Sequence, residues 1–311
     1  TLARALLRDT PMQLRMWRGE ESLREDIREN LDVELDQRRS MEFGEQFSDA
    51  YPVDGARPRD YLQRLVPVGN TQLLLTGIRF HYFLEFPFVD IVASTEPLED
   101  QASMRRAIDA LRHEYDAFEP ECVRILCPAD RSPPRPEDLE VSADQYIVIG
   151  SIDRLTERRM PRHDESVRLV AVDDIEEAVE FVQTAYEEFF ARQPMFEDRI
   201  VPADNERLSR ARQTGALYYI EVNGSRAGLL ATRDKLGPLV RGQTVVEEIL
   251  TSQYRGRGIA PVAQRRLIDR LAESHPGALV RGTIDAENTP SRATAHRVGR
   301  RTVATWYWYR W

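Results

Sequence analysis

An α/β fold with a mixed sheet, shared between two domains, is the architecture that the sequence predicts. β-Rich runs alternate with segments of helical apolar spacing along the whole chain, an Asn-Gly pair joins two of the runs as a hairpin, and a glycine-rich turn links a strand to a helix. The 311 residues exceed the ~100 to 200 of a usual single domain, so each half can bury its own core.

The composition is that of a globular protein, with 41% apolar and 31% charged residues. The net charge of −9 argues against a nucleic-acid partner and mildly favours a cationic substrate, although surface carboxylates that only maintain solubility are the simpler explanation. No run approaches the ~18 apolar residues of a membrane span, and the first residues lack the apolar core of a signal peptide. We therefore expect no membrane partner and a cytoplasmic location.

Three residues are notable for their rarity. Cys122 and Cys127 are the only cysteines, and we expect both to be buried, reduced thiols, because a metal site would need more ligands nearby. Lys235 is the only lysine, which we ascribe to a bias in base composition.

The first half of the chain predicts helices, then strands, a helix and more strands. One amphipathic helix or two are expected between residues 13 and 49, where Leu23, Ile27, Leu31 and Leu35 recur at helical spacing. After them we expect strands at 71–80, 86–95, 122–127 and 146–152, a helix at 100–119 and a proline-rich loop at 131–136.

A polar stretch between residues 155 and 167, broken by Pro161, marks the expected domain boundary. It makes 1–160 an N-terminal α/β domain and 165–311 a C-terminal domain; the alternative is a surface loop within one continuous domain. The C-terminal domain predicts strands at 167–172, 216–222, 227–232, 244–251, 278–284 and 303–311, and helices at 175–189, 206–212, 258–274 and 290–298.

The turn after the strand at 244–251 has the chemistry of an anion-binding site. Its sequence is Gln253-Tyr254-Arg255-Gly256-Arg257-Gly258-Ile259-Ala260. The glycines let the backbone approach a ligand closely, and the helix that begins there offers unpaired N–H groups and the positive end of its dipole. The arginines add positive charge. A tight turn without a ligand is the alternative, and the turn matches neither a Walker A motif nor a dinucleotide fingerprint.

The turn resembles the Gln/Arg-x-x-Gly-x-Gly/Ala signature of the GNAT superfamily of N-acetyltransferases, with Gln253, Gly256 and Gly258 at its fixed positions. A second segment, Asn288-Thr289-Pro290-Ser291 with Gly299 eleven residues after the asparagine, is similar to the superfamily's Asn-x-x-Ala, helix, x-Gly-Phe ending. The order of elements is similar as well, and the resemblance covers about 145 residues from Val167 onward.

The resemblance implies an N-acetyltransferase that moves an acetyl group from acetyl-CoA to a primary amine of a small molecule or peptide by direct attack, without a metal. It also implies that the turn holds the CoA pyrophosphate and that the strand before it binds the pantetheine arm. The implied cofactor-binding residues are Ile249, Leu250, Thr251, Gln253, Arg255, Gly256, Arg257, Gly258, Ile259, Ala260, Asn288 and Arg292.

Direct attack by an amine requires a general base, and carboxylates on the same strand usually serve in the superfamily. Glu247 and Glu248 are adjacent there, so their side chains point to opposite faces. We prefer Glu248, which shares its parity with Leu250, although a β-bulge would reverse the choice in favour of Glu247. The alternative is that one or both glutamates only contact solvent or pair with an arginine.

Two positions depart from the superfamily pattern. Ala295 stands where a tyrosine commonly protonates the departing thiolate, and His296, one residue further, lies about a hundred degrees round a helix. Arg300 replaces the phenylalanine that normally follows the glycine. Three functions therefore stay open: an N-acetyltransferase, an acyltransferase for longer acyl-CoAs, and a non-catalytic acyl-CoA-binding regulator. The oligomeric state stays open too.

The N-terminal half contains a strand, helix and strand in the same order as the cofactor unit. Its turn, residues 94–100, contains no glycine and three acids, which would repel a pyrophosphate. We interpret this half as a degenerate GNAT-like domain in a tandem arrangement, with an unrelated α+β domain as the alternative.

Overall fold

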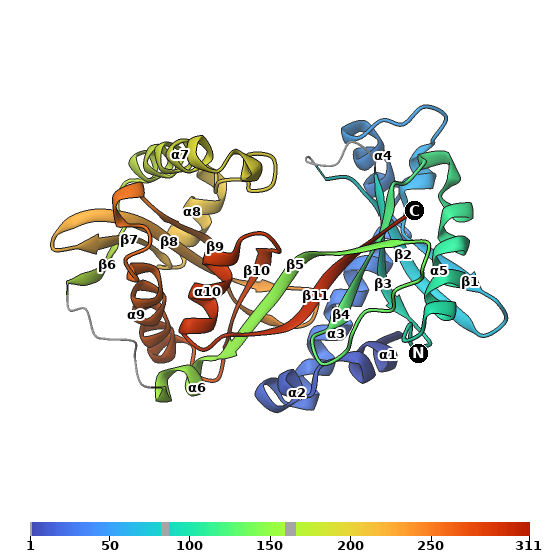
Figure 1. The fold of residues 1–311 in the computed structure, drawn as a ribbon, viewed down its shortest axis with the longest axis horizontal. Coiled ribbons are helices and arrows are strands. Elements are labelled where there is room, and N and C mark those ends of the chain that lie inside the picture. The colour runs from blue at the N-terminus through green and yellow to red at the C-terminus, as the bar shows by residue number, and fades with distance from the viewer. Residues whose placement is uncertain (1, 82–86, 159–165) are drawn as a thin grey trace. The chain divides into compact units, whose positions relative to one another are not determined.

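The computed structural model describes residues 2–81, 87–158 and 166–311 of the chain (Figure 1). Its contacts define two compact units. The first contains Thr1–Tyr146, Pro238–Val240 and Val303–Trp311, and the second contains Ile147–Gly237 and Arg241–Thr302. The boundary expected between residues 160 and 165 lies outside the described residues. The units differ from the expected domains in two ways: two segments from beyond residue 165 belong to the first unit, and the residues from Ile147 onward that precede the expected boundary belong to the second.

Helices fill the start of the first unit, and its strands follow. The helices are α1 (Leu2–Asp9), α2 (Met12–Arg18), α3 (Glu20–Gln37), α4 (Met41–Ala50) and α5 (Gln101–Glu114), with short 3-10 turns η1 (Pro58–Tyr61) and η2 (Asp116–Phe118). The strands are β1 (Arg64–Val68), β2 (Gln72–Arg79), β3 (Phe88–Ser94), β4 (Cys122–Pro128) and most of β5 (Glu140–Ser151) and β11 (Arg301–Arg310).

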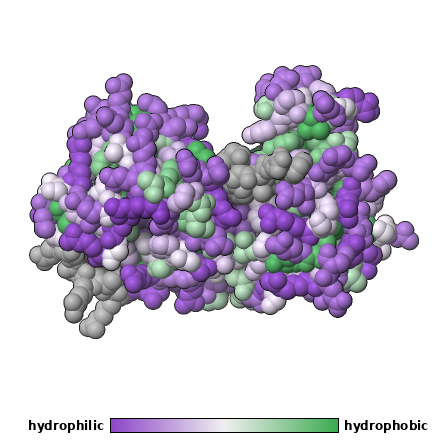
Figure 2. Space-filling view, turned by 45° about the horizontal axis from the view of Figure 1, so that its top comes forward, coloured by the Kyte–Doolittle hydropathy of each residue, from purple (hydrophilic) through white to green (hydrophobic). Residues whose placement is uncertain are grey.

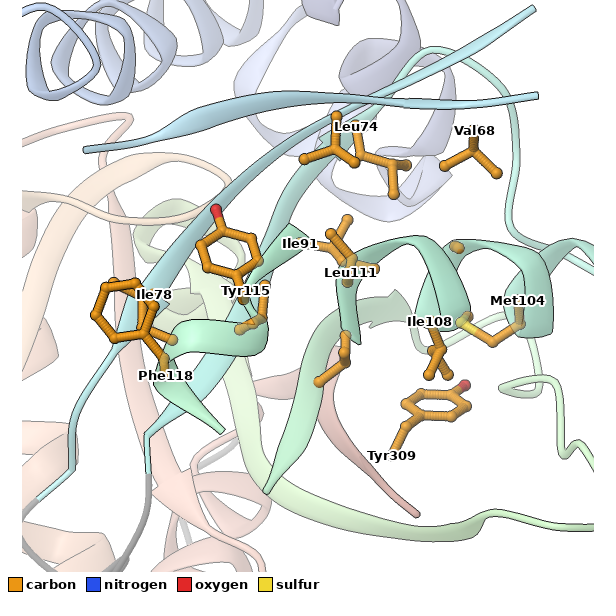
Figure 3. Packing of buried hydrophobic residues seen from close by; sticks show 14 of the residues in the cluster. Val68, Leu74, Ile78, Ile91, Met104, Ile108, Leu111, Tyr115, Phe118 and Tyr309 are labelled. Atoms are coloured by element: carbon orange, nitrogen blue, oxygen red, sulfur yellow. The ribbon is translucent and has the colours of Figure 1, made fainter. Parts of the chain in front are cut away.

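The strands of the first unit follow the order β1-β2-β3-β4-β11. β1, β2 and β3 are antiparallel neighbours, β3 and β4 are parallel, and β11 runs antiparallel to β4. Helix α5 connects the parallel pair and packs its apolar face, which includes Met104, Ile108 and Leu111, against the sheet (Figure 3). Tyr309 of β11 lies in the same cluster and is fully buried, so the last strand completes the core of the first unit.

A buried arginine neutralised by two acids lies on the sheet of the first unit. Arg124 of β4 donates through Nε and Nη2 to Asp90 of β3, at 2.7 and 3.0 Å, and through Nη1 to Asp144 of β5, at 3.1 Å. The guanidinium also lies 4.4 Å from the ring centre of Trp306. The two carboxylates raise the pKa of Arg124 against the effect of burial, which lowers it.

The two cysteines of β4 are buried free thiols, as the sequence predicts. Burial raises the pKa of both Cys122 and Cys127 to about 12, because the thiolate is poorly solvated there. Both are therefore unreactive at neutral pH.

The second unit contains a pair of helices, then a meander of antiparallel strands, and then a helix that leads to a further strand. Its helices are α6 (Ile152–Glu157), α7 (Ile175–Arg192), α8 (Asn205–Gln213), α9 (Ile259–Ser274) and α10 (Thr289–Arg297), with η3 (Pro194–Phe196) and η4 (Ser252–Tyr254). Its strands are β6 (Val167–Ala171), β7 (Leu217–Val222), β8 (Ser225–Leu236), β9 (Arg241–Leu250) and β10 (Leu279–Asp285).

The strands of the second unit follow the order β10-β9-β8-β7-β6, in which only β9 and β10 are parallel. Two apolar clusters cover opposite faces of this sheet. One contains Ile249 and packs against α7 and α8, and the other contains Val280 and packs against α9. Figure 1 shows these helices on either side of the strands. Each face of β9 therefore looks toward a different helix layer.

The structure confirms every helix and strand expected in the second half, with ends shifted by a few residues. The hairpin at Asn223 and Gly224 is also confirmed, with both residues at positive φ. The sequence did not predict α1, α6 or β1, which are short; β1 also contains Pro67, which weakens a strand pattern. Residue 86, at the start of the strand expected over 86–95, lies outside the described residues.

The surface is largely hydrophilic on the face shown in Figure 2, with small scattered apolar patches. Among the described residues, no helix has both the length and the apolar character needed to cross a membrane.

Candidate active site

The turn between β9 and α9 leaves the start of the helix open. Gly256 and Gly258 both adopt left-handed conformations, with φ of 72° and 77°, and a Cβ at either position would meet no atom within 4 Å. Gly258 precedes α9, and no side chain of the described residues caps the helix there. The first N–H groups of a helix lack intrahelical acceptors, so those of Ile259 and Ala260 are available to a ligand.

The polar side chains of the turn divide between the fold and the solvent. Arg255 turns away from the glycines, because its Nε donates to the carbonyl of Leu250 at 2.7 Å and its Nη2 to that of Ala185 at 3.1 Å. Gln253 and Arg257 are exposed, and the Arg257 guanidinium lies 5.7 Å from the ring centre of Tyr254. Arg257 thus brings its charge to the open side of the turn, whereas Arg255 anchors the turn to β9 and α7.

Strands β9 and β10 separate before they reach the turn. Their register contains only the pairs Gln243 with Val280 and Thr244 with Arg281, whereas β8 pairs with β9 as far as Leu250. Within the described residues, the second half of β9 therefore has one edge without a strand partner, and this edge leads directly to Thr251 and the turn. An extended chain with amide groups can form strand-like hydrogen bonds along such an edge.

A β-bulge at Val246 decides which way the two candidate glutamates point. Ala231 of β8 pairs with Glu247 and Thr232 pairs with Val245, so Val246 has no partner on β8. Glu247 lies on the face covered by α7 and α8, and Glu248 on the face covered by α9. The bulge that the sequence could not exclude is thus present, so the parity argument that favoured Glu248 no longer holds and the choice between the two carboxylates depends on their surroundings.

Glu247 is buried and firmly held. Its Oε1 accepts a hydrogen bond from the hydroxyl of Tyr186 at 2.8 Å, and its Oε2 accepts one from the backbone N–H of Ala203 at 2.9 Å. Burial raises the pKa of Glu247, and the two hydrogen bonds oppose that rise. Glu247 therefore connects β9 to α7 and to the segment before α8.

Glu248 is only partly satisfied. Its Oε2 accepts from Nε2 of Gln264 on α9 at 2.5 Å, while its Oε1 is buried without a hydrogen-bond partner among the described residues. Burial raises the pKa of Glu248 to about 7, against the lowering effects of the Arg300 charge and the Gln264 hydrogen bond. A carboxylate that exchanges its proton near neutral pH is well suited to act as a base.

Gln264 and Arg300 extend this site, and the sequence did not identify either as part of it. Nη2 of Arg300 donates to Oε1 of Gln264 at 2.7 Å, so Gln264 links the arginine to Glu248. Burial lowers the pKa of Arg300 to about 10, and the charge of Glu248 opposes this. The departure at Arg300 from the superfamily's phenylalanine was the available signal, because an arginine at a normally apolar position needs a polar partner.

The second motif forms a capped helix. The side chain of Asn288 accepts a hydrogen bond from the N–H of Ser291 at 3.2 Å and caps α10, on which Arg292 is half-buried. Ala295 is fully buried, whereas His296 is exposed and lies 3.2 Å from the hydroxyl of Thr302. The histidine is thus on the outer side of α10.

In the corresponding turn of the first unit, an acidic side chain caps the start of the helix. Asp100 caps α5, accepting a hydrogen bond from the N–H of Ser103 at 2.8 Å, and the Ser103 hydroxyl returns to Asp100. The N–H groups that are open in α9 are therefore satisfied in α5 by a carboxylate. No group of three or more potential metal ligands occurs among the described residues of either unit.

Neither a protein-family model nor a curated protein matches the sequence. Several solved structures, in contrast, are similar to the chain. The chain is similar to a GCN5-related N-acetyltransferase from Sphaerobacter thermophilus, with a TM-score of 0.50, 14% identity and coverage of 85% of this chain and 88% of that one. This coverage is more than either half of the chain supplies. The chain therefore has a mixed α/β GNAT acyltransferase fold, as the sequence predicts.

Two further solved structures are similar at a lower TM-score of 0.44. One is a GCN5-related N-acetyltransferase from Kribbella flavida, at 14% identity over 80% of this chain and 89% of that one. The other is a tandem GNAT protein from the clavulanic acid biosynthesis pathway, at 14% identity over 88% of this chain and 95% of that one.

Proposed function

We propose that the second unit binds acetyl-CoA and transfers its acetyl group to a primary amine of a small molecule or peptide. One arrangement carries this proposal: the unpaired edge of β9 leads into a turn of two left-handed glycines and an uncapped helix start. A pyrophosphate suits the free N–H groups of α9, and an extended chain with amide groups suits the strand edge. The fold supports the assignment to the acyltransferases.

Glu248 is the proposed general base for an acceptor that approaches from the α9 face, and Glu247 is the base for one that approaches from the α7 and α8 face. An amine is protonated at neutral pH and cannot attack until a base accepts its proton, directly or through one water molecule. The freed lone pair then forms the N–C bond with the thioester carbonyl, the C–S bond breaks, and CoA leaves as a thiolate. The nitrogen that has formed the N–C bond releases its second proton to water as the C–S bond breaks. The thiolate takes its proton from water, because Ala295 has none to give.

A non-catalytic acyl-CoA-binding regulator is the second candidate function. The fully buried Ala295 favours it, since no acid stands at the position from which the thiolate is commonly protonated. An acyltransferase for longer acyl chains uses the same site and differs only in the acyl group.

Thiol release with acetyl-CoA and a panel of amines, measured beside calorimetric titration of CoA, tests the proposal. We expect CoA binding together with turnover of at least one amine. Binding without turnover of any amine selects the regulator, and faster turnover of longer acyl-CoAs selects the other acyltransferase. Gly256→Val places a β-branched side chain at the turn and should abolish CoA binding. Unchanged affinity in this variant contradicts the assignment of the turn.

A further inference from the structure

The second unit buries an arginine for which two guanidinium nitrogens lack an acceptor within the described part of the chain. Arg281 of β10 is 3% exposed, and its Nε and Nη1 have no hydrogen-bond acceptor among the described residues. A Cβ at Gly237 would lie 1.5 Å from Nη1, so the guanidinium occupies the space above that glycine. Burial lowers the pKa of Arg281 to about 10, and no acid opposes it. A buried charge left in this state is costly, and such charges are normally paired or bind a ligand.

Arg124 is the arginine of the first unit that corresponds to Arg281, and it has an acidic partner on the neighbouring strand. In each unit a helix joins two parallel strands, β3 to β4 in the first and β9 to β10 in the second. Arg124 and Arg281 are each the third residue of the second of these strands, and each follows a valine. Asp90 pairs across from Arg124 and binds it, whereas Thr244 pairs across from Arg281. The second unit therefore keeps the arginine but has a neutral residue in place of its acid.

Other cations gather around Arg281 on the α7 and α8 face of the sheet. Thr244 of β9 pairs with Arg233 on one side and with Arg281 on the other, so all three side chains point to this face. Lys235, two residues along β8, shares it. Burial is the largest cause that lowers the pKa of Lys235, and the charges of Arg233, Arg281 and Arg207 of α8 lower it further. Among the described residues, no carboxylate raises it. We call Arg207, Arg233, Lys235 and Arg281 the cationic row.

The row runs from a buried end to an exposed one. Arg281 is enclosed, Arg233 is half-buried, and Lys235 and Arg207 are exposed. An anion can therefore approach from solvent at Lys235 and Arg207, the end of the row that leads to Arg281. In a chain with a net charge of −9, four neighbouring cations are the opposite of the overall balance. The carboxylate that acts on them in the described residues is Glu247, whose pKa the charge of Arg207 lowers.

We propose that the cationic row binds a carboxylate or phosphate group of the amine acceptor, so that the acceptor is a compact amine with an anionic group. This inference rests on the proposed acetyl transfer and names its substrate class. It replaces the cationic acceptor that the net charge mildly favoured.

The position of the row along β9 sets the size of the acceptor. Thr244 and Glu247 pair with Arg233 and Ala231, which are two residues apart on β8 because Val246 is the bulge. They therefore lie roughly 7 Å apart along the strand. The acceptor's amine then reaches the unpaired part of β9 while its anionic group lies at the row. An acceptor on this face meets Glu247 and not Glu248, which faces α9, so Glu247 is the carboxylate that takes the proton of the amine here. The N–C bond then forms and the C–S bond breaks, and the anionic group is unchanged.

Matched acceptor pairs test the proposal by initial rates with acetyl-CoA. β-Alanine is compared with β-alaninamide, and 2-aminoethyl phosphate with ethanolamine, so that each pair differs in the anionic group. We expect kcat/KM to be at least tenfold higher for the anionic member of one pair, and the preferred pair identifies carboxylate or phosphate as the group. Equal rates within both pairs overturn the inference and leave the proposed acetyl transfer intact.

Arg281→Met is the decisive variant, because it removes the unpaired charge and keeps the length of the side chain. It should raise KM for the anionic acceptor at least tenfold and leave KM for acetyl-CoA unchanged. Arg210→Gln is the control, since Arg210 lies on α8 but pairs with Glu206 at the surface and changes the net charge equally. An Arg281→Met enzyme with an unchanged KM for the anionic acceptor contradicts the proposal.

Lys235 provides a readout that does not need turnover. Lysine labelled with 13C at its ε-carbon gives one side-chain signal in this chain, because Lys235 is the only lysine. Inorganic phosphate or acetate should shift this signal at neutral pH in the wild type and in Gly256→Val, but not in Arg281→Met. A signal that neither anion moves contradicts the anion site even if acetyl transfer occurs. A shift in a protein that neither binds CoA nor turns over amines supports the site and rejects the proposed function.

Discussion

Glu248 and Arg300 share an environment in which burial acts on an acid and a base in opposite directions. Burial raises the pKa of Glu248 to about 7 and lowers that of Arg300 to about 10, because it disfavours the charged form of each. Gln264 lies between them and contacts both. The carboxylate is thereby held in position while its proton affinity stays close to neutral pH.

Glu248→Gln tests the role of this carboxylate. If Glu248 is the base, kcat should fall by about 10²- to 10⁴-fold, the usual contribution of a general base. The wild-type rate should rise with pH through an inflection near 7, because only the deprotonated carboxylate accepts a proton. Initial rates between pH 5.5 and 9 measure both effects. A large loss in Glu247→Gln and none in Glu248→Gln would transfer the role to Glu247.

The same raised pKa makes the stability of the protein depend on pH. The folded state binds the Glu248 proton more tightly than the unfolded state does. The contribution of this proton to the free energy of unfolding is therefore fully present below the ordinary pKa of 4.5. That contribution is lost as the pH rises through about 7. Urea unfolding of the wild type and Glu248→Gln at pH 5 and pH 8 serves as the control, because the variant should lose less stability over this interval.

Arg300→Met tests whether the arginine sets the proton affinity of Glu248. Removing the positive charge removes an effect that lowers the pKa of Glu248, so the inflection of the rate should move above 7. The pH profile of kcat separates this role from a structural one, because a packing defect lowers the rate without moving the inflection. A profile that keeps its inflection shows that Arg300 acts on packing alone.

Helices α5 and α9 show how one residue at a helix start changes what an element can bind. Asp100 precedes α5, and its carboxylate satisfies N–H groups of the first turn. Gly258 precedes α9 and has no side chain to do so. Both units have a strand, helix and strand in the same order, but the helix start is capped by a side chain in the first unit and uncapped in the second.

Gly258→Val and Gly277→Val form a matched pair around α9. Both glycines have a positive φ, 77° and 75°, and a Cβ would meet no atom within 4 Å at either, so each variant should lose about 1 to 2 kcal/mol to backbone strain. Only Gly258 lies at the open helix start. CoA affinity by calorimetry should therefore fall at least tenfold in Gly258→Val alone. Equal affinities in the two variants would show that the helix start does not bind CoA.

Local sequence pattern predicted the elements well and the site unevenly. The glycine turn and the strand before it could be located because left-handed glycines and helix starts depend on neighbouring residues. The partners Gln264 and Arg300 could not, because they come together only when α9 and the end of α10 pack on the sheet. Arg255 illustrates the same limit, since its charge predicted a place in the turn but its guanidinium binds the carbonyls of Leu250 and Ala185.

At the scale of the whole molecule, sequence order and structural unit do not coincide. Val303–Trp311 follow the second unit in the chain but belong to the first, where Trp308 and Tyr309 are buried. The aromatic run predicted a strand, yet no local pattern states which strand it pairs with. Register with β4 is a long-range choice, set by packing in the core of the first unit.

A chain truncated after Thr302 tests this assignment. It loses one strand and two buried aromatic side chains, at about 3 to 5 kcal/mol each, which is comparable to the total stability of about 5 to 15 kcal/mol of a domain. Hydrogen exchange should therefore show lost protection in β3 and β4, with protection retained in β7 and β8. Retained protection throughout the first unit would show that β11 is dispensable to it.

The place of β11 also has a consequence for synthesis on the ribosome. Domains generally fold as units during translation, and the N-terminal one normally folds first. Here the second unit is complete once Thr302 has emerged, whereas the first lacks its last strand until Val303–Trp311 follow. We therefore expect a reversed order of maturation, because the first unit keeps an unpaired edge on β4 until Val303–Trp311 have been synthesised.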